Sequence, residues 1–162
     1  MTLGAGATSL ALWTDSAAST GSFATGTVDI ATSPAVLFNV SAMMPGDSGQ
    51  ATLAVNNAGT ATFRYALTST NDNATLAAAM TLTVSTGACG STTGTLYTGA
   101  LSGAGFGSSA QGAQAGDRTL AGGASESLCF AWSFPTSAAN ALQGQSVSAT
   151  FTFNAEQTAN NP

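Results

Sequence analysis

Apolar and polar residues alternate along several stretches of this chain. In residues 146–153 every second side chain is apolar, and the positions between them are Ser or Thr. The same alternation occurs in residues 62–68, 80–85 and 128–134, and over a shorter stretch at 53–55. Successive side chains of a β-strand point to opposite faces, whereas an amphipathic helix repeats its apolar residues every three or four positions. These segments are therefore predicted to be half-buried β-strands.

Turn-forming residues separate the predicted strands. Pro45 and Gly46 favour a turn before a strand at 50–56, and Gly or Asn signals follow at 57–59, 87 and 122–123. Roughly seven to nine short strands joined by turns are typical of an all-β fold, here an antiparallel jelly-roll-like β-sandwich.

Three other segments depart from the alternating pattern. Residues 73–79 and 137–142 are rich in Ala and are each predicted to form a short helical turn, with Ser137 as a candidate N-cap. Residues 99–116 contain mostly Gly, Ser and Ala, which predicts a long, mobile surface loop. Residues 20–162 are expected to form the single sandwich domain, and residues 1–19 form a separate apolar N-terminal segment.

The charge content excludes several classes of partner. Of 162 residues only 6% are charged, with two basic side chains, seven acidic ones and a net charge of −5. Two cations cannot neutralise enough phosphates for nucleic-acid binding or hold the chain to anionic lipid. The chain has no apolar run of about 20 residues, so membrane insertion is not expected. Residues 3–13 match the length of the apolar part of a secretion signal but no basic residue precedes them, which is expected of a mature or nearly mature form.

Two cysteines, Cys89 and Cys129, allow one disulfide. An exported protein favours a bridge between them, and a pair of buried free thiols is the alternative.

Residue types suited to catalysis are scarce. The chain contains no His, which excludes Ser-His-Asp and Cys-His arrangements and a zinc-protease motif. The carboxylates are scattered singly, so most are expected to cap local backbone rather than form a glycosidase pair. Asp72 with its flanking Asn residues is a weaker alternative as a calcium site. Arg64 is expected to form an outward ion pair, and Trp132 to be a core residue rather than a carbohydrate platform. We expect no enzyme activity, no cofactor and no bound metal.

Several motifs together resemble the TasA and camelysin family in its actinobacterial form. In chain order they are LWTDS at 12–16, FATGTVDI at 23–30, MPGDS at 44–48, NAGT at 57–60, DRTL at 117–120 and SESLCF at 125–130. The resemblance implies a secreted protein, located in a biofilm matrix or on the cell surface, whose signal peptide is removed by a dedicated signal peptidase. It also implies a jelly-roll domain that polymerises by donor-strand complementation. Camelysin-like members have been classed as metalloproteases, but this chain lacks the His residues that such a zinc site needs.

The resemblance assigns a role to the N-terminal segment. Residues 1–19 become a candidate donor strand whose large side chains fill an open groove in a second copy of the chain, giving a head-to-tail homopolymer. The candidate interface residues are Leu3, Leu10, Leu12 and Trp13. Accessory matrix proteins are further candidate partners. One alternative is that residues 1–11 are a signal remnant that is disordered or docked in the sheet of their own chain. The other is a monomeric surface adhesin or lectin that uses the loop at 99–116.

Overall fold

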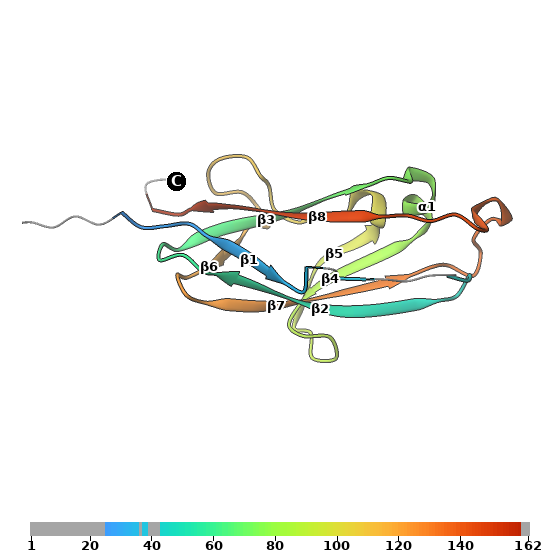
Figure 1. Ribbon diagram of the computed structural model, residues 1–162, viewed down its shortest axis with the longest axis horizontal. Coiled ribbons are helices and arrows are strands. Elements are labelled where there is room, and N and C mark those ends of the chain that lie inside the picture. The colour runs from blue at the N-terminus through green and yellow to red at the C-terminus, as the bar shows by residue number, and fades with distance from the viewer. Residues whose placement is uncertain (1–24, 36, 39–42, 160–162) are drawn as a thin grey trace, which may run out of the picture.

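The computed structural model describes residues 25–35, 37–38 and 43–159, which form two antiparallel β-sheets packed face to face (Figure 1). The larger sheet has five strands in the spatial order β1 (Ile30–Ser33), β2 (Ser48–Asn57), β7 (Ser125–Ser133), β4 (Thr81–Thr86) and β5 (Gly94–Ala100). The smaller sheet has the order β6 (Arg118–Leu120), β3 (Phe63–Asn71) and β8 (Ala149–Gln157). The predicted all-β antiparallel sandwich is confirmed.

The core lies between the two sheets and follows the predicted alternation. The inward positions named by the pattern in β2, β3, β4 and β7 are all buried, among them Val55, Phe63, Val84 and Phe130. Phe130 of the large sheet contacts Phe151 of the small sheet, with ring centroids 5.1 Å apart. Burial of these large side chains, at about 1.5–3 kcal/mol each, stabilises the stacked sheets.

The helical segments are short. The helix α1 (Ala74–Ala79) confirms the prediction for residues 73–79, and the Oδ1 atom of Asn73 caps it by accepting the backbone N–H of Leu76 at 3.0 Å. The prediction for residues 137–142 is wrong at its start. Only Asn140–Leu142 forms a 3₁₀ turn, which begins after Ala139 without a side-chain cap, so Ser137 is not its N-cap. None of the described helices is long and apolar enough to cross a membrane.

The loop predicted at 99–116 is partly core. Its first residues end β5 and form a 3₁₀ turn at Leu101–Gly103, and Leu101, Ala104 and Phe106 are buried. Phe106 exchanges two backbone hydrogen bonds with Leu67 of β3, at 2.9 and 3.1 Å. Apolar side chains placed among the Gly residues thus anchor this segment, so the prediction of a surface loop was wrong for this part.

The predicted disulfide between Cys89 and Cys129 is present. Cys129 lies on the outer face of β7, between the inward residues Leu128 and Phe130, and the hairpin between β4 and β5 folds over it. The backbone N–H of Cys89 also donates to the hydroxyl of Thr52 at 2.9 Å. The bridge therefore fastens this hairpin to the outer face of the large sheet.

Candidate functional site: an apolar groove beside β8

An apolar groove of about 880 Å³ opens between the two sheets along β8. Its floor is formed by core side chains, including Leu76, Leu82 and Trp132. One wall is the strand β8 with Phe151 and Phe153, and the opposite wall follows β1 and includes Leu37, Phe38 and Met43. The groove contains no charged side chain among its lining residues, so it suits an uncharged ligand whose buried face is largely apolar.

The groove results from the unequal width of the two sheets. The large sheet has five described strands and the small sheet three, and β8 is the last of the three. Phe63 and Tyr65 in the middle strand β3 are at most 1% exposed. Phe151 and Phe153 have the same inward orientation but are only half-buried. A further strand beside β8 would complete their burial.

The backbone of β8 presents hydrogen-bonding groups to this groove. Leu67 of β3 bonds to Phe106, so its N–H and C=O groups point away from β8. Alternate residues of a strand bond to opposite sides, so β3 and β8 are joined through pairs such as Thr68 with Thr152. It follows that the N–H and C=O groups of Phe151 and Phe153 point to the other edge of β8. Within the described ranges, no strand pairs with that edge.

The segment that leads into β8 extends the same wall and is fixed in place. The backbone N–H of Ser148 donates to Asp72 at 2.7 Å, and the amide nitrogen of Asn73 donates to the side chain of Gln145 at 2.9 Å and to the carbonyl of Ser146 at 3.1 Å. Residues 145–148 are thereby held against the turn between β3 and α1, and they line the groove. Asp72 and Asn73 thus hold residues 145–148 against this turn through hydrogen bonds. In the part of the chain that the structure describes, no group of three His, Cys, Asp or Glu residues is placed to hold a metal ion.

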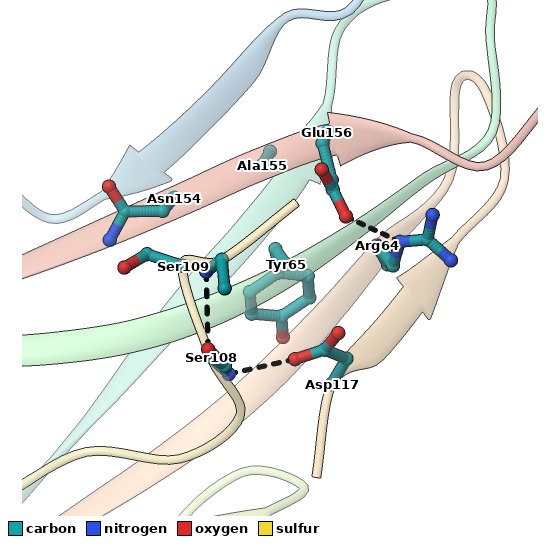
Figure 2. Close-up of a pocket in the computed structure, with 9 residues that line it drawn as sticks. Arg64, Tyr65, Ser108, Ser109, Asp117, Asn154, Ala155 and Glu156 are labelled. Carbon is teal, nitrogen blue, oxygen red and sulfur yellow. Dashed lines mark hydrogen bonds and ion pairs between the residues drawn. The ribbon is translucent and has the colours of Figure 1, made fainter. Parts of the chain in front are cut away.

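A second cavity, of about 40 Å³, lies on the outer side of the small sheet under the loop at 107–117 (Figure 2). Glu156 points toward Arg64, which it contacts at 2.6 Å, and it also accepts the backbone N–H of Gly112 at 3.0 Å. Asp117 accepts the backbone N–H of Ser108 at 2.9 Å. Glu156 fastens the loop to the sheet and Asp117 closes the loop on itself, over a cavity with room for only a few water molecules.

This loop also corrects the expectation for Arg64. The side chain forms the predicted ion pair and projects from the outer face of β3, but Arg64 is 7% exposed because the loop covers that face. Ala66 on the same face is 1% exposed for the same reason. The sequence pattern correctly predicted the direction of both side chains and missed the segment that covers them.

A buried polar cluster joins the two sheets at the edge opposite β8. Tyr65 donates its hydroxyl to Glu126 at 2.5 Å, and Arg118 contacts both carboxylate oxygens of Glu126. Burial, reinforced by Glu126, raises the pKa of Tyr65 above its usual value of 10.0. Glu126 thus faces inward rather than capping a turn, which corrects the expectation for this carboxylate. Its position two residues before the inward Leu128 was the signal that could have identified this role.

The candidate interface residues lie outside the described residues. These are the N-terminal side chains Leu3, Leu10, Leu12 and Trp13. The domain boundary expected between residues 19 and 20 also lies outside the described residues. Trp132 is 8% exposed and belongs to the core, and it also forms part of the groove floor. The groove itself was not predicted, because it depends on the order of the strands.

These features define a disulfide-bonded, antiparallel β-sandwich whose smaller sheet ends at an apolar groove. The model of a protein family described as camelysin metallo-endopeptidase matches residues 1–80, a range that includes β1, β2, β3 and α1. The resemblance to the TasA and camelysin family is thereby confirmed over residues 1–80, just under half of the 162 residues of the chain. A comparison with curated proteins found no match.

Proposed function

We propose that this protein is a non-catalytic subunit of an extracellular filament, in which the N-terminal segment of one copy occupies the groove beside β8 of another copy. The observation that carries the proposal is the combination of an apolar groove with an unpaired edge of β8. Exposed strand edges pair with added strands, and an apolar groove of this size favours covering. The filament is expected in the biofilm matrix or on the cell surface.

The N-terminal segment has the composition that the groove requires. It has no charged side chain before Asp15, and beyond Met1 it contains four large apolar side chains. In a regular strand Leu10 and Leu12 face one side, whereas Leu3 and Trp13 face the other. Only one of these pairs can enter the groove. Two leucines at about 1.5–3 kcal/mol each contribute roughly 3–6 kcal/mol before ordering costs, in addition to the backbone hydrogen bonds.

The disulfide and the low charge support an extracellular location. Disulfides persist in oxidising compartments such as the cell exterior. With so few charged groups, copies of the chain can pack closely without strong repulsion. Export and self-association therefore fit the same composition.

The family description names a metallo-endopeptidase, and the chemistry of this chain favours a role without catalysis. The sequence has no His. Among the described carboxylates, Asp47 accepts the backbone N–H of Met44 at 2.8 Å, and Asp72 and Asp117 accept backbone N–H groups in the same way. Glu126 and Glu156 are engaged by arginines. The loop at 99–116 on which an adhesin would rely is largely anchored, which favours the filament over that alternative.

Electron microscopy of the full-length protein beside a variant that lacks Met1–Trp13 tests this proposal. We expect filaments only from the full-length protein, while the shortened protein keeps the circular dichroism and cooperative thermal unfolding of a folded sandwich. A matched control deletes the three C-terminal residues 160–162 and should leave filaments intact. Filaments from the shortened protein would overturn the assignment of the donor. Monodisperse particles from the full-length protein, under all conditions of salt and concentration, would overturn the filament itself.

A further inference from the structure

The described chain begins at the pole where β8 ends. The backbone N–H of Thr27 donates to the hydroxyl of Thr60, in the turn that leads into β3. Phe63 at the start of β3 pairs with Gln157 at the end of β8. Figure 1 shows the same relation, with β1 starting and β8 ending at one end of the molecule. The 24 residues that precede Thr25 therefore join the sandwich at this pole.

The groove could be occupied by the N-terminal segment of the same chain or by that of a second copy. The position of the pole gives these two segments opposite directions relative to β8. If the N-terminal segment folded straight back into the groove of its own chain, its C-terminal end would lie at the end of β8, so it would run parallel to β8. If it continued away from the pole into a second copy in the same orientation, it would enter that copy's groove antiparallel to β8. The segment is long enough, because 24 extended residues span roughly 80 Å and the wall at 145–153 only about 30 Å.

The sandwich favours the antiparallel arrangement. Each strand pairing in the two sheets is antiparallel. Antiparallel pairing is also slightly more stable for each residue than parallel pairing. To enter the groove of its own chain antiparallel to β8, the segment would first have to cross the whole length of the molecule and then turn back. The stretch that crosses the molecule would then have no groove to occupy.

Building on the proposed function, in which the donor strand comes from a second copy, we infer that this strand runs antiparallel to β8 and is hydrogen-bonded to Phe151 and Phe153. Paired residues on neighbouring strands face the same side, so the donor residues opposite these two phenylalanines enter the groove. Leu10 and Leu12 have the two-residue spacing that matches Phe151 and Phe153. The filament is then polar, and consecutive copies are related by a translation with a twist.

Cross-linking between two populations of the full-length protein tests the direction. One population carries a cysteine in the donor, Thr2→Cys or Thr14→Cys, and the other carries a cysteine at one end of the wall, Ser146→Cys or Ala159→Cys, both exposed positions. The populations are mixed, assembled and treated with a short bis-maleimide, whose reach spans more than one residue position along the strand. Each product joins two chains, because neither population carries both added cysteines.

The antiparallel donor predicts dimers mainly from two combinations, Thr14→Cys with Ser146→Cys and Thr2→Cys with Ala159→Cys. We expect these combinations to give at least fivefold more dimer than the exchanged ones. Filaments that cross-link mainly in the exchanged combinations would overturn the direction while leaving the proposed function standing. Filaments with no cross-link in any combination would show that the donor is not in this groove. Absence of filaments would overturn the proposed function and this inference with it.

Discussion

The two edges of the small sheet are built in opposite ways. On the side of β3 that faces away from β8, the strand β6 pairs with residues 63–65, and Phe106 continues the pairing at Leu67. The cluster around Glu126 then joins this edge to the large sheet. At the edge of β8, no described strand follows, and half-buried Phe side chains border an apolar groove. Proteins usually protect strand edges against association. Among the outer strands that the structure describes, β8 combines an unpaired edge with a bordering apolar groove, and this combination indicates where a partner strand is accepted.

The largest expected effect comes from breaking the closed edge. Glu126→Ala leaves Arg118 and the hydroxyl of Tyr65 without their shared partner. Removing one member of a buried ion pair costs about 3–5 kcal/mol, and we expect roughly 2–3 kcal/mol here because Arg118 keeps 28% of its side chain exposed to solvent. Urea denaturation measures this loss. A change below about 0.5 kcal/mol, against Gln114→Ala as a surface control, would contradict the account of the closed edge.

Breaking the open edge should abolish assembly and leave the fold intact. Ala149 begins β8, and its N–H points to the groove by the same alternation that applies to Phe151. Ala149→Pro removes this donor and places a ring at the edge, and Pro is tolerated at the first residue of a strand. We expect no filaments in electron microscopy and little change in the urea midpoint.

The matched control for this variant is Thr150→Pro, one residue further along. The N–H of Thr150 points to β3, so its loss removes a bond of the sheet and costs about 1–3 kcal/mol. If Ala149→Pro destabilised the monomer as much as Thr150→Pro, the assignment of the open edge would be wrong.

The side of the donor that enters the groove can be distinguished by two neighbouring substitutions. Leu12→Ser removes a side chain that the antiparallel donor buries, and at about 1.5–3 kcal/mol it should raise the critical concentration for assembly roughly 10- to 100-fold. Trp13→Ser changes a side chain on the opposite face and should raise it less than about threefold. Sedimentation across a concentration series measures both values, and a larger effect of Trp13→Ser would reverse the assignment.

The smallest effect concerns the pH dependence of the closed edge. Because burial raises the pKa of Tyr65, the folded protein keeps this proton while the unfolded chain releases it above about pH 10. The contribution of Tyr65 to folding stability is therefore complete below pH 10 and decreases as the pH rises further. Urea midpoints between pH 9 and about 11 should fall less in Tyr65→Phe than in the unchanged protein. Equal slopes would contradict the buried, protonated state of Tyr65.

Much of the sandwich could be predicted from the sequence because strand alternation is a local property. The spacing of Phe63, Tyr65 and Leu67 is sufficient to predict which face of β3 is buried. The cover over Arg64 could not be predicted in this way, since it comes from a loop more than 40 residues further along the chain. The groove depends on which strand lies last in the small sheet, and no local pattern at Phe151 or Phe153 reports that neighbourhood.

The most direct test of the accepting edge is amide hydrogen exchange along β8, followed residue by residue in filaments and in the protein that lacks Met1–Trp13. Our account predicts that the amides of Phe151 and Phe153 exchange rapidly in the shortened protein and become protected in filaments. The amides of Thr150 and Thr152, which bond to β3, should be protected in both states. Phe151 and Phe153 amides that exchange equally fast in filaments and in the shortened protein would contradict the claim that β8 accepts the strand.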